Sequence, residues 1–134
     1  PGEPRPPWPE RKRRYIDHLH TSPDIWAVMV SAADKIHNAR SIVADLRTVV
    51  QSGTHQDAFW VRFAKTPAEP ELARRVPEIL WYYEQLSEAI LDRAKSQPES
   101  EATRRLGRLA RELQAVTAEM LALASEARYA PKEP

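Results

Sequence analysis

The sequence contains no cysteine and only three glycines among its 134 residues. The lack of cysteine excludes disulfides and thiolate metal sites, and it fits a reducing compartment. No apolar run approaches the roughly 20 residues that a membrane-spanning helix needs, and the N-terminus does not resemble a signal peptide. The net charge of +1 provides no overall field that would attract a membrane or nucleic acid. A cytoplasmic location is therefore expected.

Hydrophobic residues make up 42% of the chain and charged residues 29%, which is ordinary for a folded domain. The length fits one domain with a modest core.

The stretch from Ser22 to Gln51 predicts one long helix, with Ser22 as N-cap, Pro23 in the first helical position and Gly53 just after the end. Such a helix would be roughly 45 Å long, so we expect it to be the centre of the fold. Its apolar stripe recurs at steps of four and three and consists of Ile25, Met29, Ala32, Ile36, Ala39, Val43, Leu46 and Val50.

A second face of this helix carries Asp34 at helical spacing with Asn38 and Ser41. Val28, Val30 and Ala33 make the preceding turn apolar nearly all round, which predicts burial on both sides. A carboxylate in such surroundings must be paired or must ligate a metal. From the residues alone, two alternatives stay open for Asp34: an ion pair with a basic side chain such as Arg40, or a metal ligand.

Residues 31–40 (SAADKIHNAR) resemble the late motif of HD-domain metal-dependent phosphohydrolases. The likeness is to the branch of RelA/SpoT-type hydrolases, which cleave guanosine tetra- and pentaphosphate. It extends to residues 7–19, 57–63 and 80–83, and covers roughly residues 7–95.

The resemblance implies roles for several residues. Asp34 would be the last of the family's ligands to a catalytic Mn²⁺, and Asn38 would contact the nucleotide. Lys35 and Arg40 would be phosphate partners. The family reaction uses a metal-bound water that attacks phosphorus.

The family's other ligands, a His and an adjacent His-Asp pair, have no counterpart, and its catalytic Glu-Asp pair is also missing. One oxygen ligand cannot hold Mn²⁺ against water. We therefore expect the C-terminal half of an HD phosphohydrolase, incomplete and inactive as an isolated chain and without a catalytic residue of its own. The alternative is a non-catalytic helical interaction or dimerisation module derived from an HD protein.

Residues 1–9 (PGEPRPPWP) contain five prolines, so an extended tail or linker is expected, with a Pro-rich recognition segment as the alternative. Residues 10–20 then predict a short helix. Its basic run, Arg11 to Arg14, suits either a solvated face or contacts with nucleotide phosphates, and nucleic acid is the weaker option. A metal site at His18 and His20 is disfavoured, because the two side chains point about 200° apart on a helix.

Thr54 and Asp57 have the spacing of a capping box and predict a short helix to about Ala64. This helix concentrates aromatic area, which suits packing against the central helix or, alternatively, base stacking. The aromatic residues are Phe59, Trp60 and Phe63.

Residues 66–70 (TPAEP) predict a break, and residues 71–95 predict a further helix that either kinks at Pro77 or starts there. Trp81 and Tyr82 lie outside the apolar stripe of this helix, which indicates a second contact surface.

After a break at residues 96–100, a last helix is predicted over residues 99–128. It either folds back on the domain or pairs with a second copy, which would give a homo-oligomer. Its seam consists of Ala102, Leu106, Leu109, Leu113, Val116, Met120, Leu123 and Ala127.

The sequence as a whole predicts an all-α fold of four to five helices around the helix at about residues 22–51, a partial HD-like bundle. We divide it into a Pro-rich tail or linker (1–9), an HD-like helical region (10–95), and a C-terminal amphipathic helix with a short tail (96–134).

Overall fold

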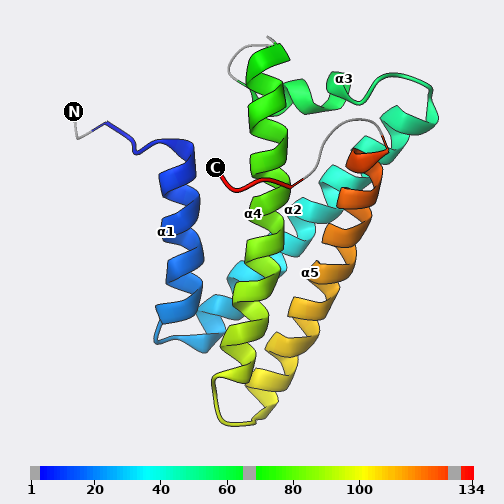
Figure 1. Cartoon of the computed structure of the whole chain (residues 1–134). Coiled ribbons are helices and arrows are strands. Elements are labelled where there is room, and N and C mark those ends of the chain that lie inside the picture. The colour runs from blue at the N-terminus through cyan, green and yellow to red at the C-terminus, as the bar shows by residue number, and fades with distance from the viewer. Residues whose placement is uncertain (1–3, 65–68, 127–130) are drawn as a thin grey trace.

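The computed structural model describes residues 4–64, 69–126 and 131–134, and all regular structure within these ranges is helical. The all-α prediction is confirmed. Each helix in the described ranges is too short or too polar to traverse a bilayer. The elements, in chain order, are α1 (Trp8–Thr21), α2 (Ile25–Gln51), α3 (Asp57–Trp60), the 3-10 helix η1 (Val61–Phe63), α4 (Glu69–Lys95) and α5 (Glu101–Ser125) (Figure 1).

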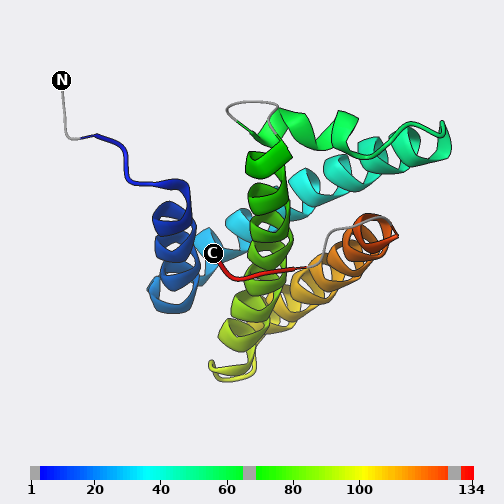
Figure 2. The same ribbon diagram turned by 45° about the horizontal axis from the view of Figure 1, so that its top comes forward.

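The helices pack side by side around α4 and α5. α5 runs alongside both α2 and α4, whereas α2 and α4 contact each other only briefly. α1 packs on α4, on the side away from α5 (Figures 1 and 2). The core therefore lies where α5 closes over α2 and α4, and a second contact layer lies between α1 and α4.

The start of α2 differs from the prediction. Asp24, not Ser22, is the N-cap: its carboxylate accepts hydrogen bonds from the backbone N–H of Trp26 at 3.0 Å and of Ala27 at 3.3 Å. Ser22 lies before the helix, where its carbonyl accepts a hydrogen bond from the buried Arg93 guanidinium. Its carbonyl is thus held by α4, and Asp24 supplies the cap. The predicted end is confirmed, since Gly53 has a φ of +79°.

The predicted capping box at Thr54 is wrong. The N-cap of α3 is Gln56, and the N–H of Asp57 donates a hydrogen bond to the ring nitrogen Nδ1 of His55 at 3.1 Å. The aromatic prediction is confirmed, since Phe59 and Trp60 are fully buried.

Gln56 links this segment to the end of α5. Its buried side-chain amide accepts a hydrogen bond from Trp60 Nε1 at 2.7 Å and donates one to the Ala124 carbonyl at 3.1 Å.

α4 runs through Pro77 without ending, so the alternative of a helix that starts there is wrong. Glu69 and Pro70 are already helical, and the rest of the predicted break, residues 66–68, lies outside the described residues.

α5 begins with Ser100 as N-cap in a capping box with Thr103, and it folds back on the domain. Because it packs on two helices at once, its buried face is rotated from the predicted seam, and Ala102, Leu109, Val116 and Leu123 are only partly buried. The predicted last turn, at residues 127–128, lies outside the described residues. The buried side of α5 consists of Thr103, Leu106, Gly107, Ala110, Leu113, Thr117, Met120 and Ala124.

Residues 131–134 lie across α4 toward α1 (Figure 1). The N–H of Lys132 donates to the Pro77 carbonyl at 3.1 Å, and Arg13 Nη2 donates to the Pro134 carbonyl at 2.7 Å.

Candidate functional site

Asp34, the residue with the strongest prediction, lies at the surface of α2. Its side chain is 61% exposed, and its carboxylate lies 3.8 Å from the ammonium of Lys35. The predicted burial on both sides is wrong, because Val30 and Ala33 on the same part of the helix are exposed to solvent. Asp34 therefore has a basic neighbour, as the ion-pair alternative requires, but the partner is Lys35 and not Arg40.

The other predicted nucleotide contacts diverge along α2. Asn38 lies one turn after Asp34 and is half-buried. Arg40 turns toward α5, where its guanidinium lies 3.7 Å from the carboxylate of Glu112. The structure thus keeps Asp34, Lys35 and Asn38 on neighbouring parts of one helix and directs Arg40 to a different neighbour.

The Mn²⁺ that the HD resemblance implies does not fit the described part of the chain. Nowhere in residues 4–64, 69–126 and 131–134 do three His, Cys, Asp or Glu side chains lie close enough to hold a metal ion. Asp34 alone supplies one carboxylate, which is too few ligands for such an ion. His18 and His20 are both exposed.

A different group of side chains meets where α1, α2 and α4 come together, and we call it the cation–aromatic cluster. The Lys12 ammonium lies 4.8 Å from the ring centre of Tyr82 and 5.6 Å from that of Trp8. The guanidinium carbon of Arg75 lies 4.5 Å from the Trp8 ring centre. Cations over aromatic faces are attracted to the ring quadrupole. The members of the cluster are Trp8, Lys12, Tyr15, Lys35, Arg75 and Tyr82.

Lys35 connects the predicted site on α2 to this cluster. Its ammonium lies 4.8 Å from the ring centre of Tyr15 on α1, and its side chain is largely buried. Asp34, next to it, is close enough to raise the pKa of Tyr82 and Tyr83, although burial is the larger cause for both. For Tyr83 the pKa rises to about 12.

Positive charge is crowded around Lys12. Burial, followed by the charges of Lys35, Arg11, Arg5 and Arg75, lowers the pKa of Lys12 to about 8. Each of these causes disfavours the protonated ammonium. A negative charge placed among these cations would reverse the effect.

Beside the cluster, α1 and α4 enclose an open pocket of about 640 Å³. Of the described residues, four arginines and one carboxylate line this pocket. The carboxylate is that of Glu78, which lies 2.9 Å from the Arg75 guanidinium. Trp8 and Phe63 supply aromatic surface. The lining residues are Arg5, Pro6, Pro7, Trp8, Pro9, Arg11, Phe63, Arg74, Arg75 and Glu78.

Several donors at this place lack a protein partner. Among the described residues, the Nε atoms of Arg11 and Arg75 and the hydroxyl of Tyr82 are buried without a hydrogen bond. Buried polar groups are normally satisfied, so such atoms are places where a ligand or water is expected to bind.

The sequence indicated part of this site. Of the basic run, Arg11 and Lys12 turn inward, as the phosphate alternative requires. Arg13 stacks on the ring of Trp81 and Arg14 pairs with Glu10, as expected of a solvated face. Arg75 was missed as a binding residue. Tyr82 was expected on a second contact surface of its helix, and the one local signal for the cluster was the four-residue spacing of Trp8 and Lys12.

Comparisons with protein-family models, curated proteins and solved structures find no match. The class of this protein is therefore defined by its structure alone. It is an all-α bundle with a basic, aromatic pocket between α1 and α4.

Proposed function

We propose that this chain binds a polyphosphorylated nucleotide, of the guanosine polyphosphate class or a related one, in the pocket beside the cation–aromatic cluster. We further propose that it is part of an HD-type phosphohydrolase that it does not complete. The observation that carries the binding proposal is the crowding of cations around Lys12, which leaves positive charge without an equivalent number of carboxylates.

The chemistry of the pocket suits a phosphate chain joined to a base. Arginine binds phosphate oxygens in a bidentate manner, and Arg11 and Arg75 each have a buried N–H without an acceptor in the described part of the protein. The rings of Trp8 and Phe63 offer surface on which a purine can stack. The volume lies in the range of pockets for molecules of nucleotide size. A nucleotide ligand also fits a cytoplasmic location.

To hydrolyse a nucleotide, the chain would need metal ligands and catalytic residues from another polypeptide segment. In the HD scheme Asp34 is the proposed ligand to Mn²⁺, Asn38 contacts the nucleotide, and Lys35 and Arg40 are phosphate partners. The remaining metal ligands would come from another polypeptide segment, and we assign no catalytic residue to this chain. The position of Lys35 supports a connection between Asp34 and the cation–aromatic cluster, because Lys35 lies between Asp34 and the Tyr15 ring.

Nucleotide binding can be tested by titration calorimetry of the chain with guanosine tetraphosphate, GDP and guanosine at fixed salt. We expect affinity to fall as phosphates are removed, and Arg11→Gln to weaken binding of the tetraphosphate at least tenfold. Arg105→Gln is the matched control, because Arg105 is an exposed arginine of α5 that pairs with Glu101. Equal affinity for guanosine and its tetraphosphate, or equal losses in both variants, would refute the proposal.

The metal requirement is tested separately by the thermal midpoint with and without Mn²⁺, for the chain and for Asp34→Ala. A metal at 100 times its dissociation constant stabilises a fold by about 2.7 kcal/mol. We expect no shift for the isolated chain. A shift that Asp34→Ala abolishes would mean that the chain completes a metal site on its own, contrary to the proposal.

A second candidate is a non-catalytic interaction module, and the exposed apolar side chains at the start of α2 favour it. Trp26 is 57% exposed and Val30 is 72% exposed, one turn apart. Exposed apolar side chains on one helix face are typical of interaction surfaces. If the chain is such an interaction module, Trp26→Glu will abolish binding of its partner protein, whereas its affinity for nucleotide will stay unchanged.

A further inference from the structure

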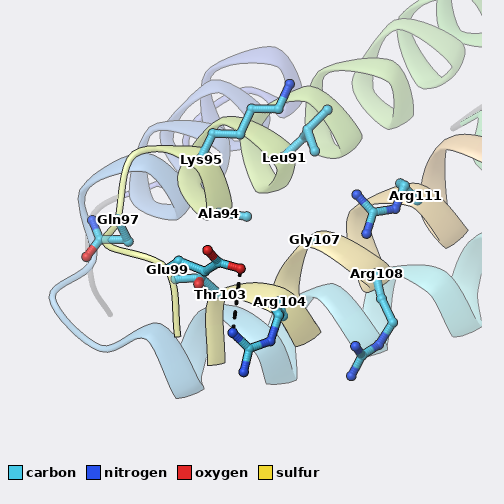
Figure 3. Close-up of a pocket in the computed structure, with 10 residues that line it drawn as sticks. All are labelled: Leu91, Ala94, Lys95, Gln97, Glu99, Thr103, Arg104, Gly107, Arg108 and Arg111. Carbon is cyan, nitrogen blue, oxygen red and sulfur yellow. Dashed lines mark ion pairs between the residues drawn. The ribbon is translucent and has the colours of Figure 1, made fainter. Parts of the chain in front are cut away.

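The outer face of the α4–α5 pair has opposite charges at its two ends. One end, toward the turn between the helices, carries the basic patch: Lys95, Arg104, Arg108 and Arg111 (Figure 3). These side chains surround an open hollow of about 430 Å³ whose one carboxylate, Glu99, lies 3.6 Å from Arg104. In the described part of the chain, Arg108 and Arg111 have no ion-pair partner.

The other end of the same face carries the acidic patch, Glu84 and Glu88, beside Thr117. Among the residues that the structure describes, no cation lines this hollow. The two carboxylates are close enough that Glu88, after burial, raises the pKa of Glu84. Thr117 is 3% exposed, and its hydroxyl has no hydrogen-bond partner among the described residues.

The two patches belong to one continuous row. On α4 the last acidic residue, Glu88, precedes Leu91 of the basic hollow by one helical turn. On antiparallel α5, Arg111 of the basic hollow likewise precedes Gln114 of the acidic one. From Arg104 to Leu121 the row extends roughly 25 Å along α5. Leu91 of the basic hollow and Leu121 of the acidic hollow are half-buried and give each hollow some apolar surface.

We propose that this face binds a second copy of the chain in antiparallel orientation. A two-fold axis that lies in the interface and crosses the helices between the patches places each basic patch against the acidic patch of the other copy. Such an interface is self-complementary, as closed two-fold dimers require. A parallel copy would oppose like charges, so the charge pattern selects the antiparallel arrangement.

In this dimer, Glu84 and Glu88 of one copy enter the basic hollow of the other. The incoming arginines or lysine meet two carboxylates that, within residues 4–64, 69–126 and 131–134, have no cation beside them. They can also donate hydrogen bonds to the Thr117 hydroxyl, which has no partner in the same ranges. The surface is separate from the proposed nucleotide pocket, whose lining shares no residue with either hollow. The helix α1, which contributes to that pocket, packs on α4 on the side away from α5 (Figure 2). The proposal is therefore independent of the proposed function.

The test uses two charge-reversed variants of the full chain, measured by sedimentation equilibrium at 50 and 500 mM NaCl. The first variant combines Glu84→Lys and Glu88→Lys, which makes both ends of the face basic. The second combines Arg104→Glu and Arg108→Glu, which makes both ends acidic. We expect the unmodified chain to dimerise, with a dissociation constant at least tenfold higher at 500 mM salt. Each variant alone will be monomeric, and an equimolar mixture will form a heterodimer.

Circular dichroism spectra will show whether each variant keeps its helix content, and Arg105→Glu, on another part of α5, is the control that leaves dimerisation unchanged. Recovery of the dimer only on mixing supports the antiparallel pairing, since simple unfolding of either variant cannot produce it. A chain that remains monomeric at 200 μM in 50 mM salt, or variants that dimerise alone as well as the unmodified chain does, would overturn the proposal.

Discussion

Removal of the Arg93 side chain is expected to be among the most damaging single substitutions in this fold. Arg93 belongs to the last turns of α4 and is only 6% exposed. Its guanidinium donates to the carbonyls of Leu19 and His20 at 3.1 and 3.2 Å, and also to that of Ser22. These carbonyls belong to the end of α1 and the turn into α2, where no intrahelical donor remains for them.

The expected loss in the free energy of unfolding follows from the three carbonyls that accept hydrogen bonds from Arg93. A hydrogen bond to a charged group contributes roughly 1.5–3 kcal/mol, and an acceptor left buried without a donor costs a comparable amount. Because the three bonds share one side chain and the turn can relax toward water, we expect Arg93→Ala to cost about 3–5 kcal/mol and not the full sum. Arg93→Lys keeps the charge, but one ammonium cannot reproduce the planar fork, so it should cost about half as much.

Urea denaturation followed by circular dichroism measures these losses as changes in the free energy of unfolding. The control is Arg47→Ala, an arginine of α2 that pairs with Glu119 on α5 at the surface. Exposed ion pairs contribute about 0–1 kcal/mol, so this variant should stay close to the unmodified chain. If Arg93→Ala cost less than about 1 kcal/mol, the proposed role of the guanidinium in joining α1, α2 and α4 would be wrong.

Two further substitutions probe the interior and the site. Gln56→Ala removes the acceptor that the Trp60 Nε1–H uses and one of the two donors to the Ala124 carbonyl, which also accepts from the Glu126 N–H, so it should cost about 1–3 kcal/mol in the same urea assay. The exposed Gln51→Ala is its control and should change stability by less than about 0.5 kcal/mol. The pKa of Lys12 is lowered from 10.5 to about 8, so between these values the unfolded chain binds the proton more tightly and stability should rise with pH. Lys12→Met should therefore be more stable than the unmodified chain at pH 7, with a difference that narrows by pH 9.5; a constant difference would contradict the crowding of charge around Lys12.

The sequence predicted the helices well and their boundaries less well. Gly53 ends α2 as expected, because a positive φ is a local property that glycine permits. The N-cap of α2 could not be chosen from Ser22 and Asp24 by local pattern, since the Ser22 carbonyl is held by Arg93, which is distant in sequence.

The prediction that Asp34 is buried was wrong for a related reason. The apolar turn around it predicted an enclosed carboxylate, but Val30 and Ala33 face solvent. Periodicity identifies a buried stripe and does not say whether additional apolar residues are covered.

The candidate site depends on contacts between helices, which explains why only a fragment of it was visible in the sequence. Lys12, Lys35 and Arg75 come from three different helices, and no spacing along the chain relates them. The HD resemblance indicated Lys35, the basic run of residues 11–14 indicated Lys12, and nothing in the sequence indicated Arg75.

The position of α5 has a consequence for how the protein forms during synthesis. α2 and α4 contact each other little and are joined mainly through α5, which follows both in the chain. A ribosome adds roughly 5–20 residues per second, so several seconds pass between the completion of α2 and the arrival of α5. Throughout that interval the apolar side chains of α2, such as Ile36 and Leu46, lack the extensive packing that α5 provides and have only the limited contacts of α2 with α3 and α4. Slow translation before residue 101 would therefore prolong the time during which the nascent chain can aggregate.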